Sequence, residues 1–252
     1  MICRRAFRQE KFLLRTFCQK FSDSKLYPEH IVTTPVQKLI LAIGSSAIAL
    51  VDPFRHDMVA VSGETLGGSA VTKMWEKMLN SEEGSQILKD KPRINSMEVD
   101  LKKLESLPEN TLGYQYIKFL RDNNITCDTR RDVRFIDDTE LAYVMQRYRE
   151  IHDLVHLVVG MPTNMLGEVV VKWIEAIQCD LAMCWGAAVF GAYRLRPKQR
   201  RRYLENHLDW AIQCGQQSSF FMNIYYEKRW EQDLEDLRRE MNLPPKPPQA
   251  KK

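Results

Sequence analysis

Residues 138 to 159 contain no glycine or proline, and their apolar side chains recur at intervals of three and four residues. Leu141, Met145, Tyr148 and Val159 share one face at this spacing, which is typical of an amphipathic α-helix. Only 11 glycines occur among the 252 residues, and 44% of the residues are hydrophobic. The sequence therefore favours helices and contains enough apolar side chains for a substantial core, in one good-sized domain or two small ones.

The first 22 residues differ in composition from the rest of the chain. Six of them are basic and one is acidic, so this segment has a net charge of +5. The whole chain has a net charge of +4, which leaves −1 for the remaining residues. Arginine-rich, acid-poor and amphipathic composition predicts a mitochondrial transit peptide at residues 1–22. A basic arm for nucleic acid or membrane is the alternative. No nucleic-acid-binding motif occurs in the remainder, so we expect no nucleic-acid partner.

The cysteines indicate a reducing compartment. There are six, and no two form a C-x-x-C pair. This pattern argues against a disulfide scaffold and against a zinc site built from thiolates.

The helical domain is expected to span residues 25–243, followed by a disordered tail rich in proline and lysine at residues 244–252.

An apolar helix is expected to begin at Thr34-Pro35, since threonine suits an N-cap and proline the first helical turn. Its segment 39–51 has 13 residues and is too short to span a bilayer. We interpret it as a buried core helix, with a helix lining a lipid-tail cavity as the alternative. No transmembrane helix is predicted.

The stretch HDLVHLVVGMPTNMLGE, residues 152–168, contains a candidate metal site. With His152 as reference, His156 lies at about 40° and Asp153 at about 100° around the helix. Gly160-Met161-Pro162 should end this helix, and Thr163 should cap a second helix that continues towards Tyr193. A tight hairpin would then return Glu168 to the histidines.

Two imidazoles with one or two carboxylates suit Zn²⁺ or Fe²⁺ better than Ca²⁺. His152, His156 and Glu168 are the expected ligands, and Asp153 is a fourth ligand or the partner of a bound water. The plainer alternative is a pair of ordinary buried histidines, but uncompensated buried polar groups cost about 1–3 kcal/mol each. The acid in H-D-x-x-H differs from that of the zinc peptidase motif H-E-x-x-H, so no peptidase is inferred.

Two further stretches could contact lipid. Small residues between 182 and 192 permit close helix packing, which we favour, or a groove for an extended apolar ligand. The run RLRPKQRRRY is usually a solvated face but could meet anionic lipid head groups. Its basic residues are Arg194, Arg196, Lys198, Arg200, Arg201 and Arg202.

The pattern H-D-x-x-H followed by eleven residues and a glutamate resembles the coenzyme Q (ubiquinone) biosynthesis family that is counted fourth in the Coq series. The stretches DPFRHDMVAVSGETLGG, RFIDDTELAYVMQRYREIHD and YYEKRWEQDLEDLRREMNLPP resemble further blocks of that family. The resemblance covers roughly residues 25 to 245. It implies an all-α fold, a single compact helical domain with a metal-binding helical hairpin, in which His152, Asp153, His156 and Glu168 hold a divalent metal. Zinc is the expected ion, and Fe²⁺ is the alternative.

The resemblance also implies an activity, partners and a location. The activity is metal-dependent removal of the C1 carboxyl group from 4-hydroxy-3-methoxy-5-polyprenylbenzoate, with Glu168 and Asp153 as catalytic residues. The alternatives are a non-catalytic lipid-binding scaffold and an oxidative decarboxylation that hydroxylates C1. Implied partners are the other coenzyme Q biosynthesis proteins of a multi-subunit complex. The implied location is the matrix side of the mitochondrial inner membrane, as a peripheral protein.

Overall fold

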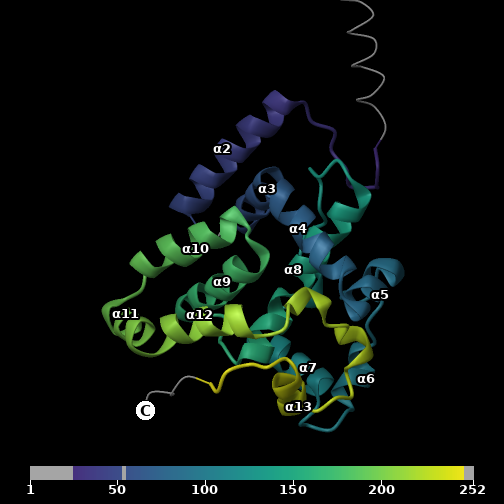
Figure 1. The fold of residues 1–252 in the computed structure, drawn as a ribbon, viewed down its shortest axis with the longest axis vertical. Coiled ribbons are helices and arrows are strands. Elements are labelled where there is room, and N and C mark those ends of the chain that lie inside the picture. Colours follow the sequence, from purple (N-terminus) through teal and green to yellow (C-terminus); the bar gives the residue numbers. More distant parts are fainter. Residues whose placement is uncertain (1–24, 53–54, 247–252) are drawn as a thin grey trace, which may run out of the picture.

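The chain folds into helices joined by short loops (Figure 1). The computed structural model describes residues 25–52 and 55–246, and within these residues no β-strand occurs. The α-helices are α2 (Pro35–Val51), α3 (His56–Leu66), α4 (Gly68–Leu79), α5 (Glu82–Asp90), α6 (Leu101–Glu105), α7 (Leu112–Asp122), α8 (Thr139–Val159), α9 (Met165–Cys179), α10 (Ala182–Tyr193), α11 (Pro197–Arg202), α12 (Leu208–Gln217) and α13 (Leu234–Glu240). The all-α prediction is confirmed. The predicted transit peptide lies outside the described residues.

Helix α8 occupies the centre of the molecule. It begins where the sequence predicts, because the Asp138 side chain accepts a hydrogen bond from the Leu141 N–H at 2.9 Å. It ends at Gly160, whose φ of 72° is a conformation that glycine adopts easily. Every residue from 142 to 159 is buried, because α4, α7, α9 and α13 pack around the helix. The one-sided apolar stripe expected from the sequence is therefore only part of its buried surface.

The buried ionisable side chains of α8 meet partners from five separate parts of the chain. These pairs are Arg147 with Glu227, Arg149 with Glu64, Glu150 with Arg93, His152 with Glu175, and Asp153 with Arg130. Removing one partner of a buried ion pair leaves an uncompensated charge, which is strongly destabilising. The five pairs therefore fix the rotation of α8 about its axis and its position along that axis relative to the surrounding helices.

The segment after α8 forms two helices where the sequence predicted one. The Asn164 side chain, rather than that of Thr163, caps α9 by accepting from the Gly167 N–H at 3.1 Å. The Thr163 hydroxyl instead donates to Asn123 Oδ1 at 2.5 Å. Asp180 then adopts a left-handed conformation with φ 57°, which ends α9 and turns the chain into α10. The predicted continuous helix to Tyr193 is wrong for this reason.

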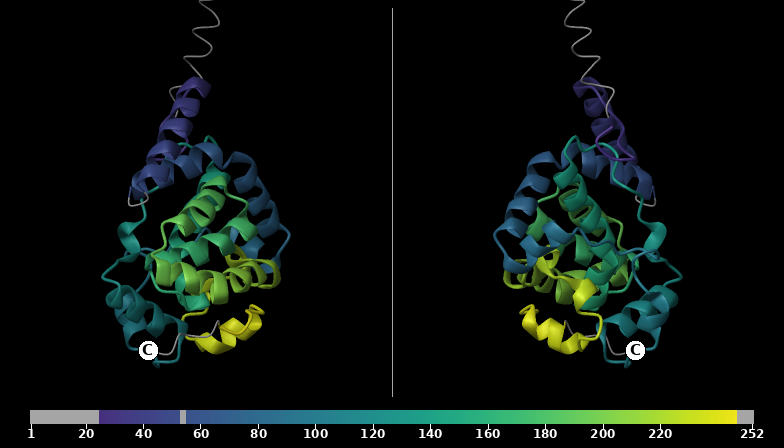
Figure 2. Two further views of the ribbon diagram at one scale, coloured as in Figure 1. Left: turned by 90° about the vertical axis from the view of Figure 1, so that its left-hand side faces the viewer. Right: turned by 90° about the vertical axis from the view of Figure 1, so that its right-hand side faces the viewer.

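Helix α2 lies at the edge of the molecule, and the prediction of a buried core helix is wrong. Its predicted start is correct, since Thr34 and Gln37 form a reciprocal capping box. However, α2 packs mainly on α3 and more weakly on α10, so its outer face remains open. Ile40 and Ile43 are 65% and 64% exposed. Both side views in Figure 2 show α2 at one end of the molecule and α13 at the other.

In the part of the chain that the structure describes, no helix has the length and apolar character needed to cross a membrane. The first residues of the predicted tail lie against the body, because the Trp210 Nε1–H donates to the Pro245 carbonyl oxygen at 2.7 Å. Residues 247–252 lie outside the described residues.

Candidate metal centre

His152 and His156 project from one face of α8, one turn apart, towards Glu168 in the first turn of α9. The two imidazole rings meet edge to face with centroids 4.8 Å apart. His152 Nε2 lies 3.5 Å from Glu168 Oε2, and His156 Nε2 lies 3.3 Å from Glu168 Oε1. The helical hairpin thus brings these three predicted side chains together, with one ligand atom of each within 4.8 Å of the others.

These distances fit a divalent ion. Two ligands that each lie about 2.0–2.1 Å from a tetrahedral ion stand roughly 3.3 Å apart. His156 Nε2 is completely buried, and among the described residues no group forms a hydrogen bond with it. Such an atom costs folding free energy unless a further partner satisfies it. The donor set and this unsatisfied nitrogen both suit a bound metal.

A tight connection between α8 and α9 sets the position of Glu168. The His156 ring contacts this connection directly, because its Nδ1 lies 3.3 Å from the Met161 carbonyl oxygen. Gly167 packs so closely that a Cβ atom there would lie 1.8 Å from the Pro162 carbonyl oxygen. Glycine is therefore required beside Glu168, because any side chain would push α9 away from the loop.

Asp153 does not join this cluster of three. Its Oδ1 accepts a hydrogen bond from Arg130 Nη2 at 2.5 Å, and its side chain is buried. Burial disfavours the charge on Arg130, but Asp153 raises the pKa of the guanidinium above its ordinary value. The predicted role of Asp153 as a ligand or partner of a bound water remains a prediction.

Sequence reasoning missed the polar side chains that contact one another behind His152. Glu175 Oε1 lies 2.6 Å from His152 Nδ1, and Glu175 Oε2 accepts from Lys172 Nζ at 2.6 Å. The Tyr148 hydroxyl donates to the same oxygen at 2.7 Å. A signal was present in the sequence, since Lys172 and Glu175 follow Glu168 at i+4 and i+7 and must share its face of α9.

Opposite charges at short distance set the ionisation of this site. Burial would raise the pKa of Glu168, but His152 and His156 hold it well below its usual range. Burial likewise opposes ionisation of Glu175, yet Lys172 and His152 keep its pKa low. Burial and Lys172 lower the pKa of His152, but Glu175 and Glu168 outweigh them and raise it. In the metal-free protein, the two carboxylates on either side of His152 therefore favour its protonated form.

The permanent charges at the centre add up to a negative site. Asp153, Glu168 and Glu175 are acidic, and Arg130 and Lys172 are their cationic neighbours. With neutral imidazoles the cluster carries one net negative charge, which a divalent cation would reverse to one net positive charge. The centre therefore has the charge that attracts a metal ion and, with the ion bound, a monoanion.

The helical arrangement is found in a solved structure. A crystal structure of a protein from Nostoc punctiforme, assigned provisionally to ubiquinone biosynthesis, has a TM-score of 0.65 with this chain. The match covers 82% of this chain and 97% of the other, with 16% sequence identity. At this identity the likeness establishes the fold class alone, which is an all-helical domain. In this chain the polar centre lies between α8 and α9.

Sequence comparison then identifies the family. The family model for "Coenzyme Q (ubiquinone) biosynthesis protein Coq4" matches residues 27–247, and the chain belongs to this family. The "Ubiquinone biosynthesis protein COQ4 homolog, mitochondrial" of Aedes aegypti is 58% identical over 213 residues, which are 84% of this chain and 78% of that protein. The protein of the same description from Drosophila virilis is 56% identical over 217 residues, 86% of this chain and 82% of its own length. The family resemblance predicted from the sequence is confirmed.

Proposed function

We propose that this chain is a carboxy-lyase of coenzyme Q biosynthesis. It removes the C1 carboxyl group from 4-hydroxy-3-methoxy-5-polyprenylbenzoate and forms the corresponding 2-methoxy-6-polyprenylphenol. Family membership supports the pathway. The observation that carries the proposed reaction is the cluster of the buried His152 and His156 with the partly exposed Glu168, with its unsatisfied nitrogen and its charge suited to a metal and an anionic substrate.

The chemistry replaces the bond between C1 and the carboxyl carbon with a C–H bond. The 4-hydroxyl group is para to C1, so its oxygen can donate electron density to that carbon. Protonation at C1 interrupts the aromatic ring, and loss of CO₂ restores it. A divalent ion at this centre would supply positive charge for the carboxylate or phenolate.

The protein residues provide the setting for this reaction. Glu168 stays ionised, and its side chain is 37% exposed whereas His156 is fully buried. Substrate therefore reaches the centre from the side of Glu168. Asp153 is the proposed fourth ligand or the partner of a bound water, and Arg130 holds its Oδ1 in place.

Zinc is the proposed ion because two imidazoles and one carboxylate are a common donor set for catalytic zinc. The same donors with open positions also suit Fe²⁺ in oxygenases. Entry of oxygen at C1 would require such a redox-active ion, so the mass of the product distinguishes the two reactions.

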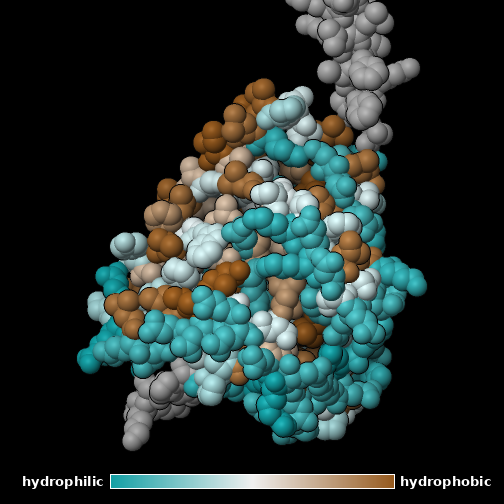
Figure 3. Space-filling model, viewed as in Figure 1, coloured by the Kyte–Doolittle hydropathy of each residue, from teal (hydrophilic) through white to brown (hydrophobic). Residues whose placement is uncertain are grey.

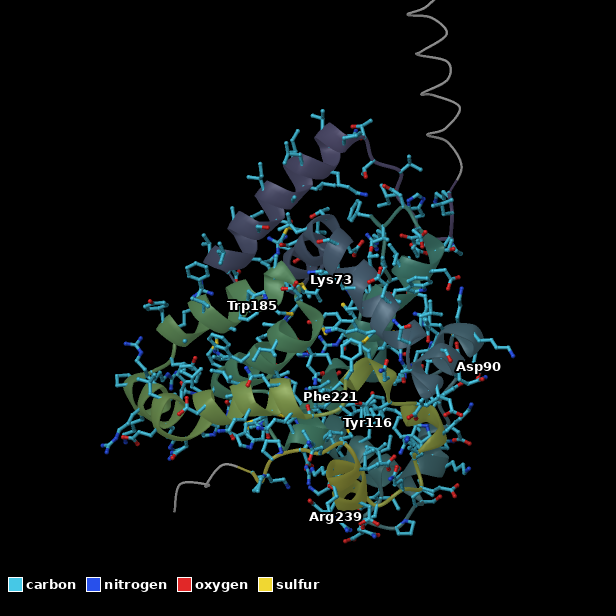
Figure 4. All side chains as sticks on the ribbon, in the orientation of Figure 1. Lys73, Asp90, Tyr116, Trp185, Phe221 and Arg239 are labelled. Atoms are coloured by element: carbon cyan, nitrogen blue, oxygen red, sulfur yellow. The ribbon has the colours of Figure 1, made fainter. Side chains whose placement is uncertain are left out.

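We assign the chain to the multi-protein complex of coenzyme Q biosynthesis proteins, peripheral to the matrix side of the inner membrane. An exposed apolar surface supports membrane contact (Figure 3). This surface comprises Val36, Leu39, Ile40, Ile43 and Val51 of α2 with Val189, Phe190 and Tyr193 of α10. A large contiguous apolar surface on a soluble domain marks an interaction site. Trp185 continues it along α10 (Figure 4).

Basic residues border this surface. Arg194 follows α10 and donates hydrogen bonds to the carbonyl oxygens of Leu50 and Val51 at the end of α2. Helix α11 continues the basic run with Arg200, Arg201 and Arg202. An apolar face beside clustered cations suits an anionic bilayer, where each basic residue near the surface contributes about 1 kcal/mol.

The proposed reaction is tested by turnover of a short-prenyl substrate with zinc-reconstituted protein. We expect a product with hydrogen at C1, and no product from Glu168→Gln, which keeps the shape of the side chain and loses its charge. Glu235→Gln is the matched control, because Glu235 also lies in the first turn of a helix but pairs with Arg238 and Lys246 instead of a histidine. A folded Glu168→Gln protein that joins its partners and still supports product formation would establish the scaffold alternative instead.

A further inference from the structure

A buried carboxylate holds His152 from the side opposite Glu168. Glu175 Oε1 lies 2.6 Å from His152 Nδ1, and the Glu175 side chain is only 4% exposed. The other oxygen, Oε2, accepts from both Lys172 and Tyr148. Tyr148 is fixed in turn, since its hydroxyl lies 3.1 Å from Cys184 Sγ. The proposed reaction assigns no role to this network.

The contacts determine which nitrogen of His152 carries the proton. Lys172 and Tyr148 place two donors on Oε2, so the Glu175 side chain must present acceptors. Oε1 can then only accept from Nδ1, which makes Nδ1 the protonated nitrogen. In the neutral ring the lone pair is left on Nε2, the atom that faces Glu168 at 3.5 Å.

His156 reaches the same orientation by a weaker contact. Its Nδ1 lies 3.3 Å from the Met161 carbonyl oxygen, which is uncharged. Both rings therefore direct Nε2 into the cluster, but only His152 is backed by a carboxylate. A carboxylate behind a ligating imidazole fixes its tautomer and increases its basicity.

We propose that Glu175 is a positioning residue that keeps His152 in the Nδ1–H tautomer and strengthens Nε2 as a metal donor, with Lys172 and Tyr148 holding Glu175 in place. The proposal rests on the proposed metal site. The proposal goes beyond that site because it gives a function to Lys172 and Glu175, the residues at i+4 and i+7 after Glu168.

The substitution Glu175→Gln tests this role without a large change of shape. Lys172 and Tyr148 both require an acceptor, so the new amide oxygen must face them and the NH₂ group must face His152 Nδ1. Nδ1 then becomes the acceptor, the proton moves to Nε2, and the lone pair aimed at the cluster is lost. We expect the zinc affinity, measured by competition with a chelator, to fall about 10- to 100-fold.

Glu64→Gln is the matched control. Glu64 is another buried glutamate paired with a cation, Arg149, at 2.6 Å, and it does not contact either histidine. We expect both variants to lower the melting temperature and only Glu175→Gln to lower the zinc affinity. Equal loss of zinc affinity in the two variants would show that Glu175 acts only through general stability.

The tautomer is measured directly by NMR of protein labelled with ¹⁵N-histidine, at a pH where the rings are neutral. The zinc-free wild type should show His152 protonated on Nδ1, and Glu175→Gln should show it protonated on Nε2. A wild-type His152 protonated on Nε2 overturns the proposal without any variant. Zinc affinity within twofold of wild type in Glu175→Gln overturns it as well, whereas a wild type that binds no zinc refutes the metal site itself.

Discussion

His156 Nε2 lies 3.3 Å from Glu168 Oε1 and yet forms no hydrogen bond with it or with any other residue that the structure describes. The His156 side chain is fully buried, so bulk water does not reach this nitrogen. Folding the metal-free protein therefore includes the cost of desolvating an unsatisfied nitrogen. A residue kept under this cost is expected to serve binding rather than stability.

Replacing His156 with leucine should consequently separate stability from metal binding. The substitution removes a buried nitrogen that lacks a hydrogen bond, but it also removes the imidazole beside Glu168, so we expect the stability of metal-free His156→Leu to stay within about 1 kcal/mol of the wild type. Stoichiometric zinc should be lost, because the ligand set is incomplete. Urea unfolding and zinc analysis measure the two effects. His207→Leu, at a histidine outside the cluster, should keep the zinc; retention of zinc by His156→Leu would contradict the site.

Metal binding should strengthen as pH rises. Glu175 and Glu168 raise the pKa of His152 in the metal-free protein above its ordinary value of about 6.5. The stability that protonated His152 contributes is therefore complete below that value and is lost as pH rises through the raised pKa. Zinc displaces this proton, so the increase in melting temperature caused by zinc should grow from pH 6 to pH 8. The same increase at both pH values would refute proton competition at His152.

Two glycines of α10 should respond differently to leucine. A Cβ atom at Gly191 would lie 2.8 Å from Val169 Cγ2, so Gly191→Leu should cost about 1–3 kcal/mol through overpacking. Around Gly186, no described atom beyond its chain neighbours and the adjacent backbone of α10 lies within 4 Å of such a Cβ position, so Gly186→Leu should leave the fold intact. The predicted tight packing thus applies at Gly191. Weaker binding of a long prenyl ligand by Gly186→Leu would support a groove there, and unchanged binding would exclude one.

Membrane contact should depend on both the apolar and the basic residues. We expect Ile40→Ser with Ile43→Ser to reduce binding to anionic liposomes at all salt concentrations. Replacement of Arg200, Arg201 and Arg202 by glutamine should reduce binding mainly at low salt, because salt screens exposed charges. Met97→Ser is the control, since Met97 is exposed but lies outside the apolar surface defined above. Unchanged flotation with liposomes in all of these variants would show that this surface does not contact the membrane.

Local signals in the sequence predicted much of this structure. The start of α8 near Asp138, the glycine that ends α8 and the return of Glu168 all follow from signals between residues 138 and 168. The same signals failed at Asp180, because a single aspartate in a left-handed conformation has no distinctive sequence pattern. The sequence therefore could not show that α9 stops there.

Long-range contacts were the other limit. Apolar composition indicates that α2 should avoid water but does not say what covers it, and its neighbours α3 and α10 reach only one side. The partners of Glu175 were likewise hidden, because Tyr148 and Cys184 come from two other helices. Spacing along α9 alone could have placed Glu175 on the same face as Glu168, but not against His152.

The five pairs between α8 and other segments determine where substitutions would damage the protein. Removing one partner of a buried ion pair costs about 3–5 kcal/mol, which is a large part of the stability of a domain. Glu64 and Glu227 are far from the metal centre in sequence, yet each holds the helix that carries both histidines. Substitution of either should deplete the folded, metal-competent protein much as loss of a ligand does. Damaging variants should therefore be scattered from α3 to the C-terminal segments instead of clustering between residues 152 and 168.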